Sequence, residues 1–240
     1  MWQSFLEDNN EFTLWSTEHF VWLGIGLSSG IFWIWLGLRQ PTEARKRHVG
    51  LLMSLIPVAA WLYFLAVILY VGCWEHKNVV PLHLCYFLNF LMPFMLARRI
   101  FWLYELTFFW IMAACIQALI TPDLTTAFPA WFAFKYWPVH IGLVLSALYA
   151  TIVYGFRPRY VGIWLSLLAG NVYLACVHPV NLWLETNFMY SCSKPPGTLL
   201  DLFGEHYLLC AEPAALLLFH IVWLPFFFMK RRAARELPMN

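Results

Sequence analysis

The chain has 240 residues, of which 62% are hydrophobic and 12% are charged, whereas soluble domains carry roughly a quarter charged residues. A soluble domain of this length could not hide so much apolar surface, which excludes an ordinary soluble protein and predicts that lipid surrounds much of the chain. The net charge of +2 says little by itself, and we expect no nucleic-acid partner.

Seven apolar stretches are long enough, at about 20 residues, to cross the hydrocarbon core of a bilayer as helices. They are residues 19–38, 49–72, 80–97, 101–120, 138–155, 160–181 and 207–229. We therefore expect an all-α membrane protein, a single domain over residues 1–240 with about seven transmembrane helices. The first stretch follows acidic residues rather than the positive segment that opens a secretory signal, so we expect it to be retained as a span.

The basic residues fall mainly on one side of these predicted spans. Twelve of the 15 Lys and Arg residues follow the first, third, fifth and seventh stretches, and the other three are Lys77, Lys135 and Lys194. Because short cytoplasmic loops are enriched in Lys and Arg, the N-terminus is predicted to lie outside and the C-terminus in the cytoplasm. The long outer segment 182–206 can then fold back as a lid.

Polar side chains are costly in lipid, so their depth along the spans is informative. Most of them fall in the outer third of the predicted bundle, although they come from spans far apart in the sequence. This distribution favours a water-accessible pocket that opens outward; the alternative is that each residue only joins two helices. The candidate pocket residues are His83, Cys85, Asn89, Gln117, Thr121, Asp123, His140, Asn171, His178, Asn181, Asn187 and Tyr190.

Helical spacing limits which of these residues can react together. His83 and Cys85 are two positions apart, so on a regular helix they point about 200° away from each other. If Cys85 is a nucleophile, its base must come from another span, and His140 lies at the matching depth. The alternative is that Cys85 is a buried structural thiol, since free cysteine often packs as a small hydrophobe.

The sequence contains few features that indicate a metal site or a cofactor site. No HxxxH or HExxH spacing and no nucleotide-binding motif is present, so we expect no metal and no cofactor. Glu212 lies inside the last span with His220 two turns on, and such a pair can relay protons in a transporter. Cys192 and Cys210 both fall on the predicted outer side, where a disulfide between them can form.

Four ordered segments resemble a known family, the YwaF-like bacterial integral membrane proteins. Pro81 to Cys85 resembles "LPLHLC", Gln117 to Leu124 "QALLTPDL", His140 to Pro158 "HG…SALY…GYRP", and Thr186 to Asp201 "TNYMYLCRKP…LLD". The resemblance runs from about residue 19 to 229 and implies a multi-pass protein of the bacterial inner membrane. More remotely, the family is similar to a mammalian transmembrane acyltransferase that remodels ether phospholipids, and to androgen-induced lipid-ester hydrolases that use a Thr and a His.

The resemblance implies an enzyme of lipid metabolism that hydrolyses or transfers acyl chains, with membrane lipids and a lipid or small hydrophobic substrate as partners. His83 and His140 carry over as site residues, and His140 is the expected base. The eukaryotic pattern has a Cys directly before the His, where this chain has Leu82, so the nucleophile stays open between Cys85 and Thr121. The candidate oxyanion donors are Asn89, Gln117 and Asn181. The alternative function is a transporter or ligand-binding membrane protein that uses the same pocket without catalysis.

Overall fold

The computed structural model describes residues 11–72, 75, 79–124, 126–194, 204 and 206–235. Over these residues the protein is all α-helical, as predicted, with seven helices. They are α2 (Thr17–Leu38), α3 (Glu43–Val71), α5 (Leu84–Arg98), the continuous α6–η1–α7 (Phe101–Trp110, Ile111–Cys115 and Ile116–Ile120), α8 (Trp131–Ile152), α9 (Val161–Leu184) and α10 (Tyr207–Arg235). A 3₁₀ turn, η2 (Phe188–Tyr190), follows α9.

Five of the helices are long and apolar enough to cross a membrane: α2, α3, α6–η1–α7, α9 and α10. Helix α5 has only 15 residues. Helix α8 has 22 residues, but it carries Lys135 and His140, and most of its side chains are buried against other helices. The protein is therefore a multi-pass membrane protein, and its orientation in the membrane remains a prediction from the loop charges.

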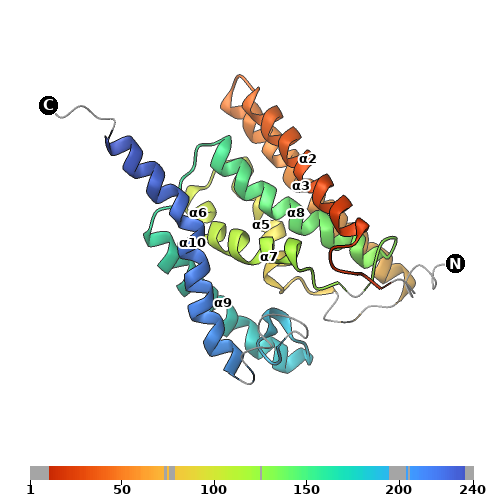
Figure 1. Ribbon diagram of the computed structural model, residues 1–240. Coiled ribbons are helices and arrows are strands. Elements are labelled where there is room, and N and C mark those ends of the chain that lie inside the picture. The colour runs from red at the N-terminus through yellow and green to blue at the C-terminus, as the bar shows by residue number, and fades with distance from the viewer. Residues whose placement is uncertain are drawn as a thin grey trace.

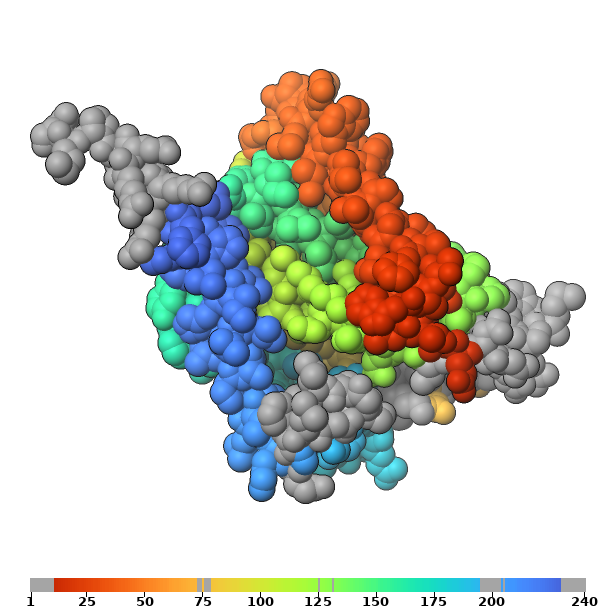
Figure 2. All heavy atoms as spheres, in the orientation of Figure 1, coloured from red at the N-terminus to blue at the C-terminus, as the bar shows by residue number. Residues whose placement is uncertain are grey.

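The helices form two groups around α8 (Figure 1). Helix α3 packs against both α2 and α5, and all three pack on α8, whereas α6, α9 and α10 pack together on its other side. On the face seen in Figure 2, α2 (red) and α10 (blue) flank the surface formed by α6 and α8. Most of the side chains of α8 are buried, so this helix is the centre of the core.

Close packing between α3 and α8 depends on a glycine. A Cβ atom at Gly142 would lie 2.5 Å from Cγ of Pro57, a distance that real side chains do not reach. Glycine therefore lets the two backbones approach at the level of the proline ring. This contact fixes the position of the first half of α8, which carries several of the polar residues discussed below.

One predicted boundary was wrong. The fifth span was predicted at residues 138–155 with Lys135 in an outer loop, but α8 begins at Trp131 and Lys135 is only 2% exposed. The predicted span excluded Lys135, because an isolated ammonium group is costly in an apolar environment. Aromatic rings around Lys135 offset that cost in the folded protein, so the helix extends past it.

Candidate functional site

Polar residues from several helices meet at one end of the bundle. Helices α5, α8 and α10 begin at this end, and α7 and α9 end there, followed by η2. The described parts of the segments that follow α7 and α9 lie against the start of α8 and the N-cap of α5. This arrangement gathers most of the residues that the sequence indicated as a pocket.

Cys85 lies in the first turn of α5, two residues after the N-cap residue His83. No side chain caps this helix start, so the first backbone N–H groups of α5 have no partner within the helix. The Cys85 sulfur lies 3.4 Å from the sulfur of Cys115, which is completely buried and ends the π-helical turn η1. The two thiols come from positions 30 residues apart in the chain.

His140 of α8 interacts with Cys85 from another side. Its ring lies near enough to the Cys85 sulfur to interact with it electrostatically. The Nδ1 atom of His140 lies 2.8 Å from the backbone carbonyl oxygen of Tyr136. A carbonyl can only accept, so Nδ1 carries the proton and Nε2 has the free lone pair. The histidine is 5% exposed and thus held in one orientation.

His83 lies under the turn η2. Its ring packs against the rings of Tyr86, Phe188 and Tyr190 at centroid distances of 6.0, 5.4 and 5.5 Å. Burial lowers the pKa of His83 below its usual value, and the positive charge of Lys135 lowers it further. A neutral imidazole at this position is consistent with its aromatic surroundings.

Lys135 lies near His83, Cys85 and His140, which together form the polar cluster. The sequence did not indicate this lysine as a site residue. Its Nζ atom lies 3.8 Å from the ring centroid of Phe64, 4.2 Å from that of Tyr86 and 4.3 Å from that of Phe132. Ring faces attract a cation, and the attraction is stronger away from water. The signal in the sequence was a lysine between aromatic residues, about one and a half helical turns before His140.

Tyr190 and Asp123 join the segment after α7 to the turn η2. The Tyr190 hydroxyl donates to Asp123 Oδ2 at 3.0 Å, and the backbone N–H of Asp123 donates to the hydroxyl of Tyr136 at 3.3 Å. Met189 and Tyr190 both have positive φ angles, 59° and 54°, which non-glycine residues rarely adopt. The surrounding contacts hold this turn over His83.

Asn181 fastens the same turn to the end of α9. Its side-chain amide donates to the carbonyl of Phe188 and to the hydroxyl of Ser191, both at 2.8 Å. Its carbonyl oxygen accepts from the Phe188 N–H and the Thr186 hydroxyl. His178 Nδ1 lies 3.1 Å from the Ser191 hydroxyl. The hydrogen-bonding groups of Asn181 are therefore fully used in holding the turn.

The sequence segments that form this site match a known protein family. A model described as the TMEM164 family matches residues 14–223, which is most of the chain. The protein belongs to the TMEM164 family. No curated protein and no solved structure matches it. The matching description thus differs from the YwaF-like name that the motifs indicated, and the match includes every residue of the polar cluster.

The other predicted site residues of this TMEM164-family chain lie beside the cluster or apart from it. The Asn89 amide donates to the Pro57 carbonyl at 3.3 Å, and its own oxygen is buried without a partner in the described part. Exposed Thr121 donates to the Gln117 carbonyl in its own helix at 3.1 Å. Asn171 instead pairs with Glu212 on α10 at 3.1 Å, and Asn187 bonds the backbone of Ser193.

The cysteines of the described segments are unpaired. Cys192 and Cys210 are both free thiols, so the predicted disulfide between them was wrong. Their helices and turn are positioned by hydrogen bonds such as that from the Tyr207 hydroxyl to the Tyr190 carbonyl, and no covalent link is needed there. Cys73 lies outside the described residues.

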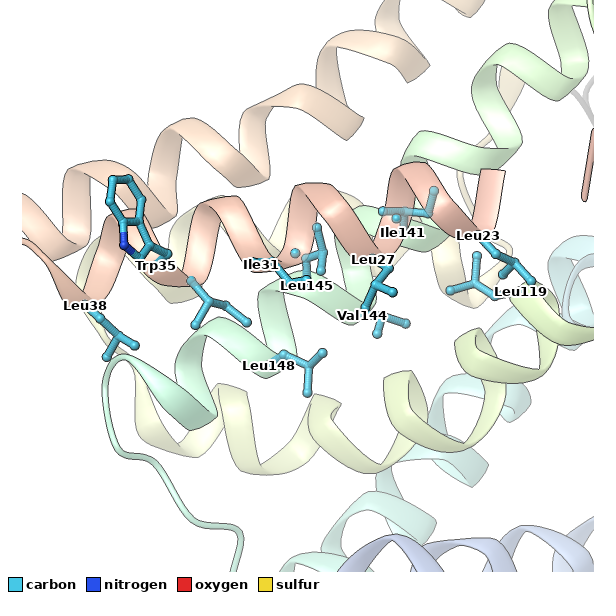
Figure 3. A pocket seen from close by; sticks show the side chains of 13 residues that line it. Leu23, Leu27, Ile31, Trp35, Leu38, Leu119, Ile141, Val144, Leu145 and Leu148 are labelled. Atoms are coloured by element: carbon cyan, nitrogen blue, oxygen red, sulfur yellow. The ribbon is translucent and has the colours of Figure 1, made fainter. Parts of the chain in front are cut away.

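An apolar groove runs along α8 on the side facing α2. It has a volume of about 520 Å³, and its walls are almost entirely hydrocarbon. Figure 3 shows side chains of α2, such as Leu27 and Ile31, on one side of it and Val144 and Leu148 of α8 on the other. One end is lined by Ile141, the residue after His140 in this TMEM164-family protein, and by Leu119 of α7.

Proposed function

We propose that this protein hydrolyses or transfers an acyl chain of a membrane lipid, with Cys85 as the nucleophile and His140 as the base. The observation that carries the proposal is that the half-buried Cys85 thiol lies near a histidine whose Nε2 is free to accept a proton. A weak nucleophile needs an adjacent, oriented base of this kind. Thr121 is the weaker candidate, because its hydroxyl is exposed and bonded within its own helix.

The reaction uses the two side chains in alternating roles. Cys85 gives its proton to Nε2 of His140, and the sulfur forms a bond with the ester carbonyl carbon. The carbon–oxygen bond of the ester then breaks, and the departing oxygen takes the proton from His140. In the second half, water or a lipid hydroxyl attacks the thioester and gives its proton to Nε2, and the sulfur leaves and regains the proton.

The negative charge that develops on the carbonyl oxygen needs hydrogen-bond donors. The uncapped start of α5 supplies backbone N–H groups beside Cys85, and the positive end of the helix dipole adds to their effect. These backbone N–H groups can stabilise the oxyanion, a role for which the sequence suggested the side-chain amides of Asn89, Gln117 and Asn181. Asn181 is already committed to holding η2, so we assign it a positioning role instead.

The groove beside α8 fits the hydrocarbon part of such a lipid. Its wall is apolar and reaches Ile141, next to the proposed base. Because the lipid tails of the bilayer are as apolar as the groove, van der Waals packing rather than the hydrophobic effect would hold the chain there. We further propose that the site works on the outer leaflet of the bacterial plasma membrane, following the charge-based orientation.

A second candidate is lipid or small-ligand transport without catalysis. The pair formed by Asn171 and Glu212 across α9 and α10 favours it, because an acidic residue within a span often marks an ion or proton path. This pair has no contact with Cys85 in the described part of the chain. An effect of Glu212→Gln on ligand movement, with Cys85→Ser silent, would favour transport over acyl transfer.

The test is acyl turnover by purified protein in vesicles of mixed phospholipids, followed by mass spectrometry of the lipids. We expect Cys85→Ser and His140→Ala each to lower turnover by a factor on the order of 10² or more, while Thr121→Ala retains it. Trapping of an acyl group on Cys85, seen as a mass increase of its peptide, would identify the nucleophile. Full turnover by Cys85→Ser and His140→Ala would contradict the proposal.

A further inference from the structure

A second thiol, the buried Cys115, touches the sulfur of Cys85. It is completely buried, and its sulfur lies against that of Cys85. The sulfur–sulfur distance of 3.4 Å is within range of an S–H···S hydrogen bond. The proposed reaction uses Cys85 and His140 but not Cys115, although Cys115 lies beside the proposed nucleophile.

The local fold brings Cys115 into this position. Residues Ile111–Cys115 form a π-helical turn inside the otherwise continuous helix α6–α7. A π turn holds one residue more than an α turn, so it rotates the residues after it relative to those before it. Such turns occur often at functional sites. Here the irregular turn ends at the residue whose sulfur meets Cys85.

The surroundings decide which thiol donates. Cys85 lies beside His140, a proton acceptor, and at the uncapped start of α5. Cys115 is completely buried and lies inside a continuous helix, where the backbone N–H groups are already bonded. Cys85 is therefore the sulfur that loses its proton, and Cys115 keeps its own and donates.

We propose that Cys115 is a positioning residue that donates its S–H hydrogen bond to the Cys85 sulfur and stabilises the thiolate. The inference rests on the proposed function only in taking Cys85 as the nucleophile. A hydrogen bond to the charged form of a group favours that form. It also holds the sulfur between Cys115 and His140, so that the thiolate does not turn away from the proposed base.

Other titratable groups face Cys85 and must be held constant in a test. Helix α5 and its cap contribute His83 and Tyr86, α8 contributes Lys135, Tyr136 and His140, and the covering segments contribute Asp123 and Tyr190. None of these groups changes in a Cys115 variant. A shift in the reactivity of Cys85 in such a variant is therefore assigned to the Cys115 thiol.

The experiment measures alkylation of Cys85 by iodoacetamide over a pH series, with peptide mass spectrometry to follow that residue. The full chain is used in detergent, with Cys73, Cys176, Cys192 and Cys210 replaced by Ser. Cys115→Ala removes the donor, Cys115→Val removes it while filling the space, and Cys115→Ser supplies a hydroxyl donor. Size-exclusion profiles establish which variants fold.

We expect the pH of half-maximal alkylation to rise by about one unit in Cys115→Ala or Cys115→Val, the equivalent of one charge-assisted hydrogen bond. Cys115→Ser should restore most of the original value. An unchanged midpoint in whichever donor-less variant folds would overturn the proposal. A raised midpoint in a protein without acyl turnover would support the hydrogen bond and contradict only the proposed function. If turnover exists, kcat should fall about tenfold in Cys115→Val with KM little changed.

Discussion

The Tyr190 hydroxyl bonds Asp123 Oδ2 at 3.0 Å and so connects two covering segments that are 67 residues apart in sequence. The same tyrosine packs its ring against His83 at 5.5 Å. One side chain thus ties the turn η2 to the segment after α7 and covers an imidazole of the candidate site.

We expect Tyr190→Phe to loosen the segment 186–193 without displacing the ring from His83. The loss of one hydrogen bond to a carboxylate at an exposed position amounts to about 1 kcal/mol, so local opening should become roughly five times more frequent. Hydrogen exchange of peptides from this segment measures the change. Tyr70→Phe is the control, because Tyr70 is a largely exposed tyrosine on α3. Equal exchange in wild type and Tyr190→Phe would show that the hydroxyl bond does not hold the turn.

The aromatic surroundings of Lys135 give a prediction about His83. The positive charge of Lys135 disfavours the imidazolium form of His83 and lowers its pKa. Lys135→Met keeps the length and apolar contacts of the side chain but removes the charge, so the pKa of His83 should rise toward its usual value. An NMR titration of isotope-labelled histidines, assigned with a His83→Gln variant, measures it.

The matched control for this titration is Lys46→Met at the opposite end of the bundle, where Lys46 pairs with Glu43. It should leave the His83 titration unchanged. A fall in the pKa of His83 in Lys135→Met, or an equal change in both variants, would contradict the assigned contact.

The α3–α8 contact predicts opposite effects of one substitution at two glycines. Gly142→Ala places a Cβ 2.5 Å from the Pro57 ring, and the helices must separate, which costs on the order of 1–3 kcal/mol. At Gly24 in α2 no atom lies within 4 Å of an added Cβ, so Gly24→Ala should be neutral or stabilise the helix by about 0.5–1 kcal/mol. Thermal unfolding in detergent compares the two variants, and a Gly142→Ala protein as stable as wild type would refute the close contact.

Filling the apolar groove should change which lipids react. Val144→Trp adds a large side chain to the groove wall, and we expect kcat/KM for long acyl chains to fall about tenfold, while short chains lose less. Leu217→Trp on the exposed face of α10 is the control, since Leu217 is 62% exposed. Turnover is compared for esters of increasing chain length. An equal loss for all chain lengths would place the acyl chain elsewhere.

The apolar stretches by themselves determined the all-α class and the seven helices, because the length and composition that favour a span are local properties of the chain. The depth of Cys85 and His140 along their stretches also indicated that the two could meet. Depth follows from counting residues along helices that must all cross the same thickness. The depth of a residue along its helix is therefore set by the sequence alone and does not depend on how the helices pack.

The rotation of each helix about its axis was decided only by the tertiary structure. Asn171 and Asn181 share one helix and similar chemistry, yet Asn171 faces Glu212 of α10, whereas Asn181 holds the turn over His83. Cys115 reaches Cys85 through a π turn, and Lys135 is buried among rings from α3, α5 and α8. These contacts arise from the packing of helices distant in sequence, and packing depends on the shapes of all the neighbouring side chains together.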